Sequence, residues 1–302
     1  MRLKFIFLFV FYTLLFLFYP GNSYHFHIFS YHRDIFAKNK EKKTQFKINP
    51  VPFVKTNFFP YLTAQGVYVL DFSSFTPVLE KNAKEKFLPA STAKIITALV
   101  SYDIYKPSKV IEVKKVVTDG QVMGLYQGEK ITVENLLYGI LVHSANDAAF
   151  ALANHFGYQK FVSLMNQKAK NLKMKNTHFV DPAGLSEDKN QYTTPFDLAL
   201  AARAILSNPY LSKMVGIKEI VVSDVDFSYF HHLVNVNKLL GEVPGVGGVK
   251  TGYTKEAGQN LVSFYKRNDH QFIIVVLKSD DRFLDTKNII DWLSWNVSYL
   301  FL

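Results

Sequence analysis

The stretch FLPASTAKIITALV, residues 87–100, places a serine three positions before a lysine in an otherwise apolar run. The apolar residues on every side predict a buried helix that begins after Pro89. A buried helix excludes an unpaired ammonium group, because removing that charge from water costs several kcal/mol. Lys94 is therefore expected either to have a partner or to be uncharged.

A partner for Lys94 lies one helical turn earlier. Residues three apart are neighbours on a helix surface, so the Ser91 hydroxyl and the Lys94 amine can come within hydrogen-bond reach. A lysine in an apolar site near a second cation has a lowered pKa, and its neutral amine can take the serine proton. The pair then predicts a nucleophilic serine that needs no histidine. The alternative is a chance S-x-x-K whose lysine extends to water.

The charge of the chain is concentrated near its start. The 302 residues carry a net charge of +10, and 48% of them are hydrophobic, which is enough for a sizeable core. Residues 1–60 contain nine Lys or Arg and two acidic residues, a net charge of +7, which leaves +3 for the remainder. The basic excess therefore belongs to a leader suited to anionic lipid or cell-wall polymer. We expect no nucleic-acid partner.

Cysteine and histidine usage excludes several kinds of site. The absence of cysteine rules out disulfides, thiolate zinc sites and cysteine nucleophiles. The nine histidines show no metal-ligand spacing such as H-E-x-x-H, and the adjacent pair His231 and His232 is expected to decorate a strand or loop. No metal site is predicted.

The N-terminal residues indicate export. Arg2 and Lys4 precede fifteen residues, Phe5 to Tyr19, that are apolar or aromatic except for one threonine. This length fits both a signal peptide and a short membrane anchor, so cleavage and retention both stay open. We therefore divide the chain into a signal peptide or anchor at residues 1–23, a tether at 24–60 and a catalytic domain at 61–302. The protein is expected outside the cytoplasm, associated with the membrane through its N-terminus.

Strands at both ends of the chain enclose a helical middle. Apolar runs bounded by turn residues predict strands at residues 66–72, 76–82, 260–266 and 271–277, the last two joined as a hairpin. Periodic apolar stretches predict helices after Pro89 and at residues 131–142, 146–156, 193–206 and 286–301. Since strands distant in sequence can share one sheet, we expect an α+β fold, an antiparallel sheet flanked by helices with a helical subdomain.

Two of the predicted helices carry start signals. Thr132 is a plausible N-cap with Glu134 in the first turn. Thr194 is an N-cap, followed by Pro195 at the first helical position and Asp197 where the acid of a capping box belongs.

Two further stretches favour a catalytic role for the serine and lysine. HSAND, residues 143–147, places a hydroxyl and an amide at a short break between two predicted helices, where both can face one cleft. GGVKTGYT, residues 247–254, lies on a predicted strand whose glycines allow an extended ligand to approach closely. The polar and glycine positions of interest are Ser144, Asn146, Lys250, Thr251 and Gly252. The order S-x-x-K, S-x-N, K-T-G is typical of penicillin-binding proteins and β-lactamases.

From about residue 61 to about residue 297 the chain resembles the low-molecular-mass D-alanyl-D-alanine carboxypeptidases, serine peptidase family S11. The segments that carry the resemblance, in family order, are LPASTAKIITALV, SANDAAFALA, HFVDPAGLS, TTPFDLALAARAIL, NVNKLL and GVKTGYTKEAGQNLV. The resemblance implies a β-lactamase-like fold. It also implies peptidoglycan stem peptides ending in D-Ala-D-Ala as substrate, β-lactams as inhibitors, and no cofactor.

The resemblance also assigns roles to the motif residues. Ser91 would be the acylated nucleophile and Lys94 its proton acceptor. Ser144 and Asn146 would form the loop that relays a proton and holds the substrate.

The remaining roles concern the predicted strand. Lys250 would meet the substrate carboxylate with the help of Thr251, and its charge would help to keep Lys94 neutral. The backbone N–H of Ser91 and that of Tyr253, the residue after K-T-G, would stabilise the developing oxyanion.

Three alternatives stay open at this stage. A β-lactamase needs a carboxylate that activates the deacylating water, and Glu187 is the nearest candidate, although its surroundings fit a surface residue better. A catalytically silent protein that binds penicillin or peptidoglycan would keep the cleft and lose part of the machinery, but every catalytic position is intact. Endopeptidase action on D,D-crosslinks uses the same residues.

Overall fold

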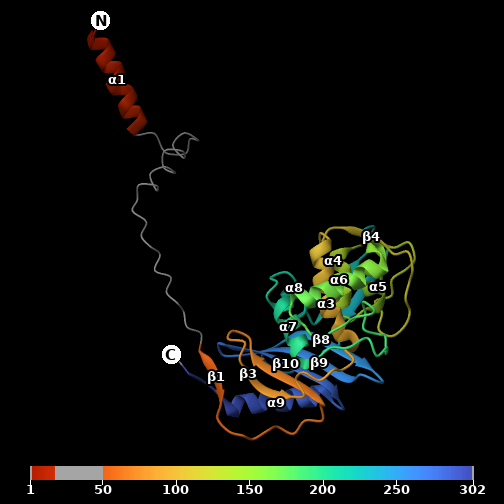
Figure 1. Cartoon of the computed structure of the whole chain (residues 1–302). Helices are drawn as coiled ribbons and strands as arrows, with labels where there is room; N and C mark the ends of the chain where they lie inside the picture. Colours follow the sequence, from red (N-terminus) through yellow and green to blue (C-terminus); the bar gives the residue numbers. More distant parts are fainter. Residues whose placement is uncertain (1, 18–49, 301–302) are drawn as a thin grey trace. The chain divides into compact units, whose positions relative to one another are not determined.

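The computed structural model describes residues 2–17 and 50–300 (Figure 1), and the chain divides into two units, residues 1–48 and residues 49–302. Within the first unit, α1 (Arg2–Leu17) is a helix. Among the described helices, none combines the length and the apolar character needed to cross a membrane. The predicted cleavage region at residues 21–23 and most of the predicted tether lie outside the described residues.

A five-stranded antiparallel sheet forms the centre of the second unit, as predicted. Its strands, in spatial order, are β3 (Pro77–Lys81), β2 (Gly66–Asp71), β10 (His270–Ser279), β9 (Gly258–Arg267) and β8 (Val246–Thr254). The predicted hairpin is β9–β10, and β10 pairs with β2 from the other end of the unit. Strand β8 is an edge strand, so one side of its backbone is available to the site.

The two faces of the sheet are covered by different helices. Along β10, Ile273, Val275 and Leu277 point into a large core shared with the helical part of the unit. The alternate residues, including Ile274 and Val276, pack against α9 (Arg282–Asn296) on the opposite face. This alternation with a period of two is what a strand buried on both faces requires.

The helical part of the unit lies between the strands in sequence and holds one end of the site. Its elements are η1 (Ala90–Ala93), α3 (Lys94–Ile104), α4 (Val133–Leu141), α5 (Asn146–Phe156), α6 (Tyr158–Asn171), α7 (Pro195–Leu206) and α8 (Leu211–Met214). Two short antiparallel ribbons flank them, β4 (Val110–Glu112) with β5 (Lys130–Thr132), and β6 (Glu219–Ser223) with β7 (Phe230–Val234).

The predicted helix caps are present, with one difference. The Thr132 side chain accepts a hydrogen bond from Asn135 N, and the Thr194 side chain accepts one from Asp197 N. The Asp197 carboxylate accepts instead from the backbone N–H of Asn176 and from the Thr177 hydroxyl. It therefore fixes the segment that leads toward the turn at residues 181–186.

Two boundaries differ from the sequence prediction. Residues 51–54, expected within the tether, form β1 (Val51–Val54), which pairs with β11 (Val297–Leu300). The last helix ends at Asn296, and the residues after it form this strand because an extended partner is available only in the folded unit. The compact unit thus begins before residue 61.

Candidate active site

Ser91 and Lys94 lie where η1 passes into α3. Residues at i and i+3 eclipse in a 3₁₀-helix, so this turn places the two side chains directly over one another. Lys94 Nζ lies 2.8 Å from Ser91 Oγ. The predicted approach of amine and hydroxyl is therefore present.

Lys94 is completely buried, and its amine has two further neighbours. Nζ donates to Asn146 Oδ1 at 2.7 Å and to the carbonyl oxygen of Ala183 at 2.9 Å. A neutral amine has two N–H groups, so these acceptors use both and leave the nitrogen lone pair facing Ser91 Oγ. Burial lowers the pKa of Lys94 to about 7, although the charges of Asp181 and Asp147 act in the opposite direction.

The Ala183 carbonyl is held in place by a turn around Asp181. The Asp181 carboxylate accepts hydrogen bonds from the backbone N–H groups of Ala183, Gly184 and Ser186 at 2.6–2.8 Å. Gly184 has φ +77°, and a Cβ at this position would lie 1.8 Å from the Ala90 carbonyl oxygen. Only glycine allows the turn to pack against η1 so closely.

Ser144 and Asn146 approach from the break between α4 and α5. Ser144 has φ +63°, a backbone conformation that residues other than glycine rarely adopt. Lys250 Nζ donates a hydrogen bond to the Ser144 hydroxyl at 2.8 Å. Asn146 Nδ2 donates to the Asp119 carbonyl oxygen at 2.6 Å while its Oδ1 accepts from Lys94. Asn146 therefore links the S-x-x-K turn to the segment before α4.

Lys250 lies on β8 and is only 3% exposed. Burial, together with the charges of Lys94 and Arg282, holds the pKa of Lys250 well below its ordinary value. We expect Lys250 to help to keep Lys94 neutral. Burial is the main cause of the lowered pKa of Lys94, and the charge of Lys94 contributes to the lowered pKa of Lys250.

A pocket of about 330 Å³ opens over these groups. Its lining residues are Ser91, Gly120, Gln121, Ser144, Asn146, Leu185, Val236, Thr251, Gly252, Tyr253 and Arg282. The motifs therefore meet at one cavity, as the sequence analysis expected of a shared cleft.

Arg282 is the pocket residue that sequence reasoning missed. Its Nη1 donates to the Gly252 carbonyl oxygen at 2.8 Å, while its buried Nε has no hydrogen-bond partner among the described residues. It stands at the start of α9 after the N-cap Asp281, in no motif, and only the fold brings it to β8. The unused donor makes it a candidate ligand for an anion.

Gly252 lets β8 lie against the nucleophile. A Cβ on this residue would stand 3.0 Å from Ser91 N and 3.1 Å from Thr92 N. Such a substituent would crowd the space beside the Ser91 N–H, where an oxyanion would bind. The participation of the Tyr253 N–H stays a prediction.

Glu187, the candidate water-activating carboxylate of a β-lactamase, is exposed and is not among the residues that line the pocket. A hydrogen bond with Glu256 raises its pKa. In the part of the chain that the structure describes, His, Asp and Glu side chains form no cluster of three that could hold a metal ion.

Comparison with known proteins gives the family. The model of the peptidase S11 family, D-alanyl-D-alanine carboxypeptidase, matches residues 53–281. The chain belongs to this family. It is 35% identical to the D-alanyl-D-alanine carboxypeptidase DacF of Bacillus subtilis over 222 residues, which cover 70% of this chain and 57% of DacF. It is 32% identical to DacC of Escherichia coli over 254 residues, which cover 77% of this chain and 62% of DacC.

A solved structure shows the same fold. The DD-transpeptidase of Streptomyces K15 aligns with a TM-score of 0.73 and 29% identity over 78% of this chain and 98% of the transpeptidase. The predicted α+β, β-lactamase-like fold is thus confirmed. The chain spans about three fifths of the length of the two curated carboxypeptidases named above.

Proposed function

We propose that this member of the S11 family is a serine-type D-Ala-D-Ala carboxypeptidase that removes the terminal D-alanine from peptidoglycan stem peptides. The observation that carries the proposal is the Ser91–Lys94 contact at 2.8 Å, with the Asn146 and Ala183 oxygens placed to accept both N–H groups of a neutral amine. This geometry supplies a nucleophile and its base at neutral pH.

Acylation starts with transfer of the Ser91 proton to Lys94 Nζ as Oγ attacks the carbonyl carbon of the penultimate D-alanine. The oxygen of the tetrahedral intermediate lies near the Ser91 and Tyr253 N–H groups at the junction of η1 and β8. Collapse of the intermediate breaks the peptide bond. Ser144, hydrogen-bonded to Lys250, gives a proton to the leaving amine and is reprotonated by the proton that Lys94 took from Ser91, so D-alanine departs and Lys94 is neutral again.

The terminal carboxylate of the substrate needs a cationic partner in the pocket. Thr251, Arg282 and Ser144 line the pocket, and Lys250 Nζ donates to the Ser144 hydroxyl at 2.8 Å. We assign carboxylate recognition to Thr251, Arg282 and Lys250 together. Water then attacks the ester on Ser91 while Lys94 accepts a proton from it, the ester bond to Oγ breaks, Lys94 returns the proton to Oγ, and the shortened peptide leaves.

The direct test is release of D-alanine. The full-length protein is incubated with an N-acylated peptide ending in D-Ala-D-Ala, and free D-alanine is measured. We expect release by the wild type and none by Ser91→Ala. A wild type that is folded but releases no D-alanine contradicts the proposal. Adding a peptide amine as acceptor distinguishes transpeptidation, the activity that names the Streptomyces K15 relative, from hydrolysis.

Penicillin separates the carboxypeptidase from a β-lactamase. The drug carries a carboxylate and keeps its leaving group tethered after the ring opens, so Ser91 should be acylated and deacylation should lag. Glu187 does not line the pocket, which favours a persistent ester. We expect a covalent mass increase on the peptide that contains Ser91. Lys250→Ala should slow labelling, because it should raise the activation free energy of acylation by roughly 2 to 4 kcal/mol. Rapid turnover of penicillin without an adduct would favour the β-lactamase.

We also propose an extracytoplasmic location, since peptidoglycan lies outside the cytoplasmic membrane and the first residues resemble an export signal. Membrane attachment through the N-terminus remains part of this proposal. Fractionation of cells tests it, and a cytoplasmic pool of active full-length protein would refute it.

A further inference from the structure

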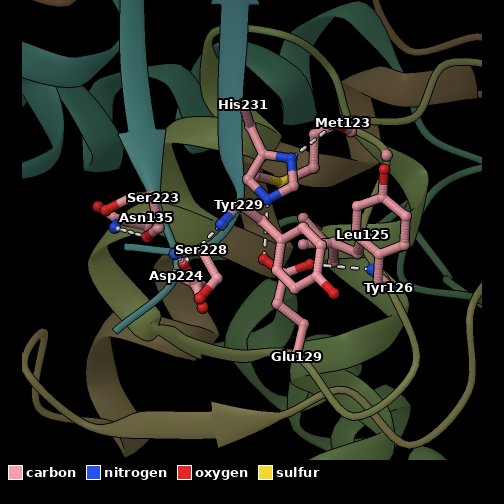
Figure 2. Close-up of polar contacts among 12 residues, drawn as sticks. Met123, Leu125, Tyr126, Glu129, Asn135, Ser223, Asp224, Ser228, Tyr229 and His231 are labelled. Atoms are coloured by element: carbon pink, nitrogen blue, oxygen red, sulfur yellow. Dashed lines mark hydrogen bonds and ion pairs between the residues drawn. The ribbon is translucent and has the colours of Figure 1, made fainter. Parts of the chain in front are cut away.

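His231, on β7, is a buried histidine outside the catalytic motifs. Its Nδ1 lies 3.0 Å from the Met123 carbonyl oxygen, and its Nε2 lies 2.8 Å from Glu129 Oε1 (Figure 2). The side chains of His231 and Glu129 are 4% and 0% exposed. We expected this residue to decorate a strand or loop, but both of its ring nitrogens make hydrogen-bond contacts.

Both ring nitrogens of His231 face acceptors. A backbone carbonyl can only accept, so Nδ1 must carry a proton. The contact between Nε2 and the carboxylate also needs a proton, whether this proton sits on the ring or on the carboxyl group. The observed pair of contacts therefore requires one proton more than a neutral histidine and an ionised glutamate possess. Loss of that proton would leave a carboxylate oxygen facing a nitrogen lone pair.

The ribbon of β6 and β7, which carries His231, is joined to the helical part of the unit through β6. Asn135 Nδ2, on α4, donates to the Ser223 carbonyl oxygen at 2.8 Å, and the Asp224 carboxylate accepts from the N–H groups of Ser228 and Tyr229 at the turn between β6 and β7 (Figure 2). His231 therefore lies on a ribbon that is held in place, and its contacts can position a neighbouring segment that has no regular secondary structure.

That partner is the segment 119–129, which has no helix or strand of its own. Gly120 and Gln121 of the segment line the pocket. The Gln121 carbonyl oxygen accepts from Asn146 N at 2.7 Å, and the Asp119 carbonyl oxygen accepts from Asn146 Nδ2. The segment therefore sets the orientation of the amide whose Oδ1 holds Lys94.

We propose that His231 is a positioning residue for the reaction, and this inference rests on the proposed function. When both of its ring nitrogens make their contacts, His231 holds the segment 119–129 in the position in which the segment orients Asn146 and, through Asn146, the amine of Lys94. The effect on chemistry passes through Asn146, since His231 itself is not among the residues that line the pocket.

The charges around His231 favour the contacts of its ring. Burial disfavours the imidazolium, but the hydrogen bond and charge of Glu129, the Met123 carbonyl and the charge of Asp147 outweigh it and raise the pKa above its ordinary value of 6.5. Glu129 comes from the segment and Asp147 from α5, where its carboxylate also accepts from the N–H groups of Met123 and Gly124. The contact should weaken as the pH rises through the raised pKa.

The first experiment compares two neighbouring histidines in the full-length protein. His231→Gln cannot reproduce both contacts, and we expect penicillin to acylate Ser91 about tenfold more slowly. His232→Gln is the matched control, because His232 is exposed and lies 3.4 Å from the exposed Glu219. Equal acylation rates in the two variants, both folded by circular dichroism, would overturn the proposal.

The second experiment measures the acylation rate as a function of pH. A contact with only a structural role would not make this rate depend on the protonation of the His231–Glu129 pair. In Glu129→Gln the introduced amide can donate to Nε2 of a neutral His231 and still accept from Tyr126 N, which Glu129 Oε2 does at 2.9 Å. We expect the wild type to lose acylation rate on the alkaline side and Glu129→Gln to lose less. Contributions of Lys250 and of His143, which contacts Gln121, are common to both proteins. Coinciding profiles would overturn the proposal.

A third readout does not depend on activity. The side-chain amide signal of Asn146 in ¹⁵N NMR should shift with the same midpoint as the His231 ring in the wild type, and this shift should be absent in His231→Gln. If the Asn146 signal changes with pH in the same way in the wild type and in His231→Gln, the positioning role is overturned. A wild type that shows this coupling but releases no D-alanine contradicts the proposed function alone.

Discussion

At the scale of single residues, the lone pair of Lys94 decides the chemistry. The Asn146 and Ala183 oxygens accept hydrogen bonds from its amine, and burial lowers its pKa to about 7. Two consequences follow, one for rate and one for stability. The buried amine makes acylation possible, but its burial destabilises the folded protein.

The rate of Ser91 acylation should rise with pH through about 7, since the pKa of Lys94 is lowered from 10.5 to about 7 and only the neutral amine accepts a proton. Lys94→Met should abolish acylation and melt at least as high as the wild type at pH 7, because an apolar side chain replaces a desolvated amine. Lys168→Met, at an amine paired with Asp103 and partly exposed, is the control. Penicillin labelling and thermal melts measure both effects, and a normal labelling rate in Lys94→Met would remove it from the mechanism.

Sequence reasoning recognised the residues in motifs and missed those placed by the fold. Ser91 and Lys94 were predicted because three residues form about one helical turn, so a local rule gives their contact. Arg282 reaches Gly252 only because α9 begins beside the end of β8, and no local pattern encodes that approach. Asp181 lies within a segment that resembles the family, but its hydrogen bonds to the N–H groups of the following residues depend on a turn that no local pattern specifies.

At the scale of elements, the turn around Asp181 and η1 support each other. The turn brings the Ala183 carbonyl to Lys94, and its contact with the Ala90 carbonyl depends on a missing side chain at Gly184. A substitution that disturbs this contact should therefore displace the acceptor of Lys94 and also lower the stability of the unit.

Gly184→Ala should destabilise the protein and slow acylation. The substitution imposes the left-handed strain of about 1 to 2 kcal/mol and also a Cβ at 1.8 Å from a backbone oxygen, so the turn or η1 must move. Gly241→Ala is matched, since Gly241 has φ +79° and its nearest neighbour would be 3.7 Å away. Urea unfolding and penicillin labelling give the comparison, and equal losses of stability in both variants would contradict the packing argument.

Element boundaries show the same limit of sequence reasoning. Thr132 and Thr194 were identified as caps because the signal is local, and both accept the expected hydrogen bonds. Strand β11 continues directly from α9, and the residues 297–300 were predicted as helix because their partner β1 lies at the other end of the unit. Pairing of distant segments overrode the local helical pattern.

At the scale of the whole molecule, the compact unit is closed by its two ends. Val51 to Val54 pair with Val297 to Leu300, and the Trp292 indole N–H donates to the Phe58 carbonyl oxygen at 2.7 Å. These contacts lie outside the set of pocket residues, so they should matter for stability more than for reaction.

A protein that begins at residue 49 should therefore be more stable than one that begins at residue 61. The shorter protein loses β1 and leaves the Trp292 N–H without its acceptor, which alone costs about 1 to 3 kcal/mol. Both should still be acylated by penicillin at 25 °C. Denaturant midpoints check the difference, and identical midpoints would restore the boundary at residue 61 that the sequence predicted.

The guanidinium of Arg282 also affects the choice of assay buffer. It lines the pocket with an unused buried donor, and none of the described residues that line the pocket is acidic. Small oxyanions should occupy this cationic space and compete with the substrate carboxylate. Sulfate or phosphate should raise the apparent KM more than sodium chloride of equal ionic strength, which only screens. Kinetic constants for this protein should accordingly be compared only between buffers that share the same anion.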